Sequence, residues 1–261
     1  MQVWIVSGGA LDDNFAADIL IRAGLRRDKD KKLSAAPGGP ILIGADRGGC
    51  LLYRLGFRPD YLIGDFDSTG KEDRRKLEEE KLPLIVLPTR KDDTDTEAAL
   101  NLALLLDRDH YQSLPPQERK MQDLKELPVE LGSHQIDSIV ILGATGSRLD
   151  HVLGSIAVLG QALGARAGRG IPSCILDPRN RIRLVDPDHP LTLAREDQWG
   201  TYLSLIPFGG PCRGVTLRGT AYPLEDADLD LYSSRGVSNE IVSRASLSLR
   251  EGCLLLIESQ D

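Results

Sequence analysis

Residues 61–68 read YLIGDFDS, an apolar run that ends at Gly64 and is followed at once by two aspartates. The run has little alternation of polar and apolar residues, which predicts a strand buried on both faces. Similar runs occur at Val3–Ser7, Ile41–Ala45, Leu84–Leu87 and Ser138–Leu142, with helical patterns at Thr94–Leu106 and Leu149–Leu163. This alternation predicts a Rossmann-like α/β domain whose sheet is mostly parallel and covered by helices on both faces. Ligands in such sheets bind at the carboxyl ends of the strands.

After about Gly170 no long helical pattern remains. The segments CILDPRNRIRLVD (174–186), TYLSLIPF (201–208), RGVTLRG (213–219) and SLSLREGCLLLIES (246–259) are short, β-prone and separated by turn residues. Hairpin turns are predicted at Asp177–Asn180 and Arg250–Gly252. We therefore expect an α/β catalytic domain over residues 1–170 and an all-β sandwich domain over residues 171–261. Arg26–Pro40 and Asp107–Asp137 interrupt the pattern, the first as a solvated loop and the second as a surface excursion with a short helix.

Composition narrows the class of protein. The chain has 261 residues and a net charge of −7, which argues against nucleic-acid binding because that requires a basic surface. An acidic protein that binds a polyphosphate must overcome charge repulsion, and a divalent metal is the usual solution. The four cysteines form no CxxC pair, which argues against zinc and redox motifs. No signal peptide or membrane span is recognisable, so we expect a cytoplasmic protein without membrane contact.

Acidic residues follow three of the predicted strands. Asp65 and Asp67 stand at positions i and i+2, and in extended backbone their carboxylates would face one space, where a cation such as Mg2+ would relieve their repulsion. Asp46 follows another strand and precedes two glycines that would let backbone N–H groups approach an anion. Asp95 follows a third strand, and the residue before it, Thr94, is a predicted N-cap with Glu97 three residues later, a capping box. The alternative is structural, since aspartates also cap turns and favour helix N-termini.

A fourth strand end carries GATGSRLDH, residues 143–151. It is neither a Walker A loop nor GxGxxG, but Thr145 and Gly146 lie in a Gly-rich turn that brings Arg148 and His151 to a helix start, a cradle for phosphate oxygens. His151 could instead be a core histidine, and Asp150 could orient it or pair with Arg148. Together, the four strand ends predict a Mg2+-polyphosphate site without a P-loop.

These motifs together resemble the signature blocks of the thiamine pyrophosphokinase family. GADRGG (44–49), LGFRPDYLIGDFDS (55–68), KDDTDTEAAL (91–100) and GATGSRLDH (143–151) occur in the family's order, and TYLSLIPF, GTAYPLED (219–226) and SRGVSNEI (234–241) resemble its β-domain segments. The resemblance implies a homodimer that transfers the pyrophosphoryl group of ATP to the hydroxyl of thiamine and releases AMP. It also implies that the thiamine site lies near the subunit interface.

The resemblance also implies residue roles. Asp65, Asp67 and Asp95 would bind Mg2+, and the phosphate and substrate site would be lined by Asp46, Lys91, Thr94, Arg148, Asp150 and His151. Ser238 and Asn239 would contact thiamine. Tyr222 stands where many members carry a tryptophan, and its ring face can still stack on a cationic ring.

Three alternatives stay open at this point. The first is a kinase or pyrophosphokinase that acts on another small alcohol, since its metal and phosphate residues would be the same. The second is a non-catalytic nucleotide sensor, and the third is a metal-dependent phosphohydrolase. The phosphohydrolase would usually need more histidines than the four present here. No residue pattern identifies the general base for the acceptor hydroxyl or the preferred nucleotide.

Overall fold

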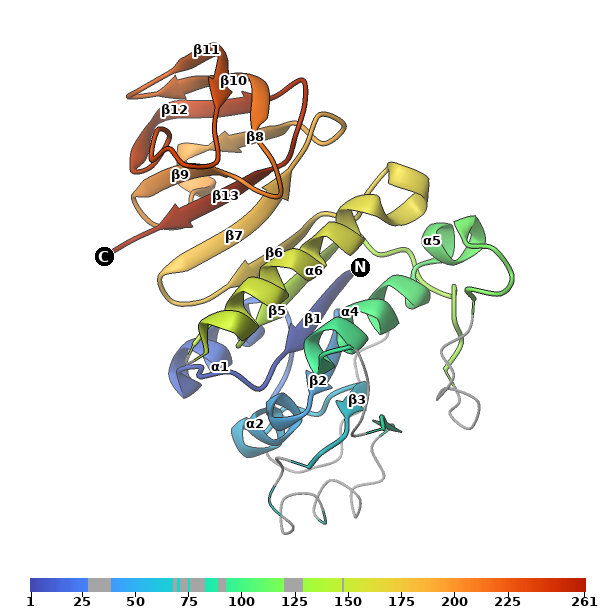
Figure 1. The fold of residues 1–261 in the computed structure, drawn as a ribbon. Coiled ribbons are helices and arrows are strands. Elements are labelled where there is room, and N and C mark those ends of the chain that lie inside the picture. Colours follow the sequence, from blue (N-terminus) through green and yellow to red (C-terminus); the bar gives the residue numbers. More distant parts are fainter. Residues whose placement is uncertain are drawn as a thin grey trace.

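The computed structural model describes residues 1–27, 39–67, 70, 75, 83–88, 93–119, 129–146 and 148–261. Its first part alternates strands and helices (Figure 1). The strands are β1 (Gln2–Val6), β2 (Ile41–Ala45), β3 (Tyr61–Gly64), β4 (Leu84–Val86), β5 (Ser138–Leu142) and β6 (Ser173–Leu176). The helices are α1 (Asp13–Arg22), α2 (Arg47–Leu55), α4 (Asp95–Leu106), α5 (Arg108–Ser113) and α6 (Leu149–Gly168).

These six strands form a parallel sheet in the order β6-β5-β1-β2-β3-β4. The chain runs outward from β1 to β4 and then returns to place β5 on the other side of β1. Parallel sheets of this kind bind ligands where the strand order reverses, because the loops on either side of that point leave a crevice. The switch point here lies between β1 and β5.

Each face of the parallel sheet carries its own core. Val3 and Ile5 point into a cluster with the leucines and alanines of α4 and α6, whereas Trp4 and Val6 point into a cluster with α1 and α2. The strands therefore need apolar residues at successive positions, which explains their lack of alternation. Burial on both faces keeps the strand ends rigid, so residues that follow them are well placed to form a site.

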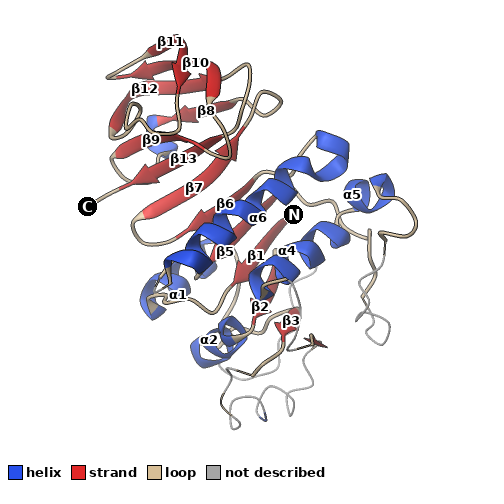
Figure 2. Ribbon diagram, viewed as in Figure 1, coloured by secondary structure: helices blue, strands red, loops and turns tan. Residues whose placement is uncertain are grey.

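The second part consists of strands joined by turns, apart from the 3-10 turn η2 (Arg195–Asp197) (Figure 2). Its strands are β7 (Asn180–Val185), β8 (Leu191–Ala194), β9 (Tyr202–Pro207), β10 (Cys212–Thr220), β11 (Leu224–Leu229), β12 (Asn239–Ser248) and β13 (Leu254–Ser259). β13 lies between β7 and β9, while β10 lies between β11 and β12. The first residues of β12 pair with β9 and its later residues with β8 and β10, so this strand joins the two layers around one apolar core.

The structure confirms that the chain combines an α/β part with a β part. The predicted strands Ile41–Ala45, Tyr61–Gly64 and Ser138–Leu142 match to the residue. The hairpin turn at Asp177–Asn180 is confirmed, because β6 and β7 pair in antiparallel fashion. The hairpin predicted at Arg250–Gly252 is wrong: β12 and β13 are not partners, since each pairs with β9 and other strands instead.

The domain boundary predicted at residue 170 lies just before β6. This strand pairs in parallel with β5, so one sheet continues across the boundary. The segment predicted as a surface excursion, Asp107–Asp137, contains the short helix α5, but Asp107 itself is fully buried. Residues 28–38 of the first interrupting segment and 120–128 of the second, together with Lys91, lie outside the described residues. None of the described helices is both long and apolar enough to span a membrane, and the cytoplasmic location stays a prediction.

Candidate active site

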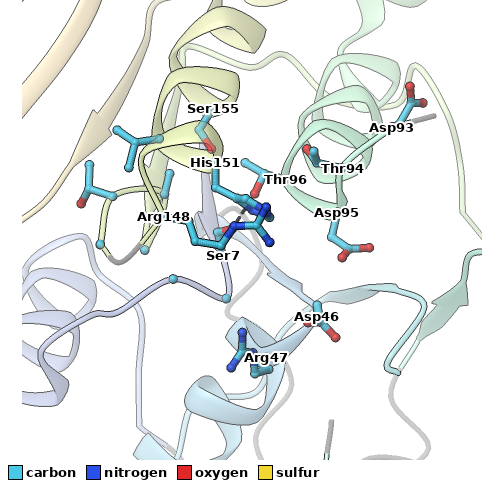
Figure 3. Close-up of a pocket in the computed structure, with 17 residues that line it drawn as sticks. Ser7, Asp46, Arg47, Asp93, Thr94, Asp95, Thr96, Arg148, His151 and Ser155 are labelled. Atoms are coloured by element: carbon cyan, nitrogen blue, oxygen red, sulfur yellow. Dashed lines mark hydrogen bonds between the residues drawn. The ribbon is translucent and has the colours of Figure 1, made fainter. Parts of the chain in front are cut away.

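A cavity of about 330 Å3 opens at the carboxyl ends of β1, β2 and β5 (Figure 3). It is lined by Ser7, Gly8, Gly9, Asp46, Arg47, Asp93, Thr94, Asp95, Thr96, Gly143, Ala144, Thr145, Gly146, Arg148, His151, Val152 and Ser155. In this view the carboxylates of Asp46 and Asp95 lie on one side and the side chains of Arg148 and His151 on the other. The cavity therefore combines anionic groups, which suit a cation, with cationic groups, which suit phosphate oxygens.

Close backbone contacts hold the loops around the cavity together. The N–H of Gly9 donates to the carbonyl oxygen of Gly143 at 2.9 Å, joining the loop after β1 to the loop after β5. A Cβ on Gly9 would lie 2.3 Å from that oxygen, and a Cβ on Gly48 would lie 1.9 Å from the carbonyl oxygen of Val6. Only glycine fits at these two positions, because any side chain would push the loops apart.

The anionic side is built on two neighbouring strand ends. Asp46 begins α2 with φ of 47°, and Gly64 packs directly against it, since a Cβ on Gly64 would lie 3.2 Å from the Asp46 Cα. Asp65 therefore starts beside Asp46, although Asp65 and Asp67 are not among the residues that line the cavity. Within the described part of the chain, no three His, Cys, Asp or Glu side chains lie close enough to form a ready-made metal site.

The extended backbone expected between Asp65 and Asp67 is wrong. Phe66 has φ of 55° and is buried against Leu62, so the chain turns at this residue. The N–H of Asp67 then donates to Asp65 Oδ1 at 3.1 Å. Asp65 thus caps a turn, which is the structural alternative that the sequence offered, and the ring of Phe66 is buried at that turn.

The start of α4 confirms half of the predicted capping box. Thr94 Oγ1 accepts the N–H of Glu97 at 3.2 Å, as an N-cap should. The carboxylate of Glu97 instead accepts a 2.6 Å hydrogen bond from Gln161 on α6. This contact ties α4 to α6, the helices that carry Asp95 and His151.

On the cationic side, Arg148 and Asp150 form a two-pronged ion pair. Arg148 Nε donates to Asp150 Oδ1 at 3.1 Å, and the closest nitrogen–oxygen distance is 2.5 Å. The hydrogen bond from Arg148 lowers the pKa of Asp150 to about 2, so the carboxylate is charged at neutral pH. Of the two roles considered for Asp150, pairing with Arg148 is the one the structure contains. Both side chains are exposed, so Arg148 can exchange this partner for a phosphate at little cost.

Sequence reasoning missed three hydroxyl groups in the cavity lining, those of Ser7, Thr96 and Ser155. Ser7 directly follows β1, and this position is the only feature of the sequence that indicates that Ser7 belongs to a site. Thr96 and Ser155 lie inside helices, where a hydroxyl has no motif of its own. Asp93 also lines the cavity and stands next to the predicted N-cap, and Thr145 and Gly146 line it as expected.

The residues expected to contact thiamine lie in the β part. The side chain of Asn239 is only 4% exposed, and its amide accepts the N–H of Tyr222 at 3.0 Å and donates to the Tyr222 carbonyl at 2.6 Å. It thereby fixes the turn that presents Tyr222, whose side chain is 72% exposed. Ser238 has φ of 57°, and its N–H donates to Ser204.

Both parts of the chain match known protein families. Residues 37–167 match the family model described as thiamin pyrophosphokinase, catalytic domain, and residues 188–254 match the thiamin pyrophosphokinase, vitamin B1 binding domain. The chain belongs to the thiamin pyrophosphokinase family. The family predicted from the sequence is thus confirmed, and its two models cover the α/β part and the β part in turn.

Individual relatives agree with this assignment. The chain is similar to the thiamine pyrophosphokinase of Bacillus subtilis (strain 168), with 31% identity over 223 residues that cover 85% of this chain and 88% of the relative. The crystal structure of a Bacillus subtilis thiamine pyrophosphokinase superposes with a TM-score of 0.72 and 27% identity, covering all of both chains. The thiamin pyrophosphokinase of Candida albicans, at 16% identity, shares the fold alone, with a TM-score of 0.70 and coverage of 99% and 89%.

Proposed function

We propose that this protein transfers the pyrophosphoryl group of ATP to the hydroxyl of thiamine, giving thiamine diphosphate and AMP. The observation that carries the proposal is the cavity in which Asp46 and Asp95 face Arg148 and His151 at the switch point of the sheet. We infer thiamine as the acceptor and pyrophosphoryl transfer as the reaction from membership of the thiamin pyrophosphokinase family.

We infer that the aspartates at this edge of the sheet would hold Mg2+. The chemistry of the donor set fits, because Mg2+ prefers the oxygen ligands that aspartates provide. Asp95 lines the cavity, and Asp65 and Asp67 follow β3 beside Asp46, so these aspartates are the proposed ligands. When bound, the ion neutralises charge that develops on the phosphate oxygens.

The remaining groups would position the reactants. Arg148 offers a planar pair of donors to phosphate oxygens once it leaves Asp150, and Asp150 keeps the guanidinium oriented until then. Thr145 and Gly146 line the cavity together with His151, and their backbone N–H groups are the proposed donors to phosphate oxygens. The thiamine oxygen attacks the β phosphorus, and the bond from that phosphorus to the oxygen of the α phosphate breaks, so AMP leaves.

The acceptor side of the site supports a dimer. β10 and β11, which flank Tyr222, lie at the opposite end of the molecule from α1 and α2 (Figure 1). We infer a homodimer in which the β sandwich of one subunit brings its Tyr222 turn to the cavity of the other. Light scattering that gives the mass of a single chain at assay concentration would contradict this arrangement.

The test is a product analysis. The protein is incubated with ATP, Mg2+ and thiamine, and the products are separated by chromatography and weighed by mass spectrometry. We expect one AMP and one thiamine diphosphate for each thiamine consumed. ADP with thiamine monophosphate would show that the enzyme transfers a single phosphoryl group, as an ordinary kinase does. AMP formed only when another alcohol replaces thiamine would show that thiamine is not the acceptor. ATP binding without any product would identify a sensor.

A further inference from the structure

The floor of the cavity holds a pair of hydroxyl groups that no part of the proposed chemistry has used so far. Ser7 lies at the end of β1 and Thr96 in the first turn of α4, and their side-chain oxygens are 2.5 Å apart. Both residues are 7% exposed, and both line the cavity (Figure 3). Their hydrogen bond joins two elements that are 89 residues apart in the chain.

The Ser7–Thr96 pair can donate one hydrogen bond beyond the one that joins its two hydroxyls. Two hydroxyls carry two protons, and their mutual hydrogen bond uses one of them. The other proton needs an acceptor, and within the described part of the chain neither oxygen has a second hydrogen-bond partner. Because both residues line the cavity, a ligand oxygen placed there can accept this proton, and a hydrogen bond to a charged oxygen is stronger than one to a neutral group.

We propose that the Ser7–Thr96 pair donates its free proton to an oxygen of the pyrophosphoryl group that is transferred. This inference rests on the proposed function, which places a triphosphate in the cavity. An anionic acceptor is expected because the cationic side chain of Arg148 lines the same cavity. Both residues line the cavity and either oxygen can be the donor within the pair, so Thr96 or Ser7 can present the free proton to the ligand.

The structural alternative is that the pair merely fastens α4 to β1. The two roles make opposite predictions. If the pair only fastens the helix, removing either hydroxyl breaks the single hydrogen bond, and removing both does no further harm. If the pair serves a ligand, each single removal leaves one hydroxyl whose own proton is then free, so ligand binding survives. Only removal of both abolishes the donor.

The variants Ser7→Ala, Thr96→Val and their double combination test this. The probe is inorganic pyrophosphate with Mg2+, titrated by calorimetry, and AMP is titrated in parallel. We expect each single variant to bind pyrophosphate within about threefold of the unchanged protein. We expect the double variant to bind it about 10- to 100-fold more weakly, the range for a lost hydrogen bond to a charged group. AMP binding should not change.

Stability and a matched substitution provide the controls. The double variant should unfold at a temperature close to that of the unchanged protein, because two apolar groups of similar shape leave no buried hydroxyl unpaired. Thr216→Val makes the same chemical change on β10, away from the cavity, and should alter neither titration.

Three results would overturn the inference. Single variants that bind pyrophosphate as weakly as the double variant would show a fastening role, and a double variant with unchanged affinity would show no contact. An equal loss for AMP would place the donor away from the transferred group. If the unchanged protein bound no pyrophosphate and no ATP, the proposed function itself would fail, and this inference with it.

Discussion

Asp107 holds the far end of the α/β part together, and its removal should destabilise the protein strongly. Its fully buried carboxylate accepts hydrogen bonds from Arg166 Nε at 2.9 Å, from the N–H of Ile136 at 2.9 Å and from the N–H of His110 at 2.8 Å. Arg166 lies where α6 leaves helical geometry, with φ of 54°. One side chain thus joins α4, α5, α6 and the segment before β5.

The expected cost follows from the charge left behind. Removing one partner of a buried ion pair costs about 3–5 kcal/mol. The Arg166 side chain is still 17% exposed, so solvent partly stabilises its charge when Asp107 is removed. We therefore expect the free energy of unfolding to fall by the lower limit of this range, about 3 kcal/mol, in Asp107→Asn. For a chain of this size, that predicts a fall in Tm of about 6–12 °C. Adding Arg166→Met should restore part of the loss, because the unpaired charge is then removed as well.

The dependence on pH gives a second signature. Burial raises the pKa of Asp107, but the hydrogen bonds from Arg166 and from the two backbone N–H groups outweigh it and hold the pKa below its usual range. The stabilisation is therefore present above the unfolded pKa of about 3.9 and is lost as the pH falls through the lower folded value. The difference between the unchanged protein and Asp107→Asn should be constant near pH 7 and shrink below about pH 4.

Thermal and urea unfolding, followed by circular dichroism, measure both effects. The matched control is Asp137→Asn, whose carboxylate is 71% exposed and pairs with the N-terminal amine at 2.7 Å. An exposed pair contributes about 0–1 kcal/mol, so this variant should change Tm by no more than about 4 °C. Equal and small losses for the two variants would refute the reasoning, because they would show that burial of Asp107 carries no extra stabilisation.

Three further predictions concern the site. Asp65→Asn should abolish AMP formation while the circular dichroism spectrum is retained; near-normal turnover at millimolar Mg2+ would remove Asp65 from the metal site. Arg148→Lys should raise the KM for ATP about tenfold, because a point charge cannot replace the planar fork; unchanged ATP kinetics at saturating thiamine would show that Arg148 does not bind phosphate. Tyr222→Ala should raise the KM for thiamine about 2- to 30-fold through a lost cation–π contact, whereas Tyr222→Phe should stay close to the unchanged protein; an alanine variant with the original KM would mean that Tyr222 does not touch the acceptor.

The candidate site was predictable where a polar residue lies in the loop or at the helix start after a strand, although Asp65, which directly follows β3, does not line the cavity. Asp46, Asp95 and Arg148 each stand near the end of a short apolar run, and the structure brings all three to one cavity. Ser7 also follows a strand, but its role depends on a partner in α4 that no local pattern announces. The Asp65–Asp67 turn matches the alternative that the sequence left open, since Asp65 accepts the N–H of Asp67; only the tertiary structure decided between this turn and an extended pair.

The sequence by itself determined the alternation of strands and helices, the N-cap at Thr94, the turn at Asp177–Asn180 and the family. These are properties of contiguous residues, because local backbone preferences and short hydrophobic patterns are contained in the segment that carries them. Only the tertiary structure decided that β5 returns to the side of β1, that β12 joins two layers, and that Asp107 is an anchor. Such contacts join segments far apart in the chain, and their choice depends on how all the buried surfaces pack at once.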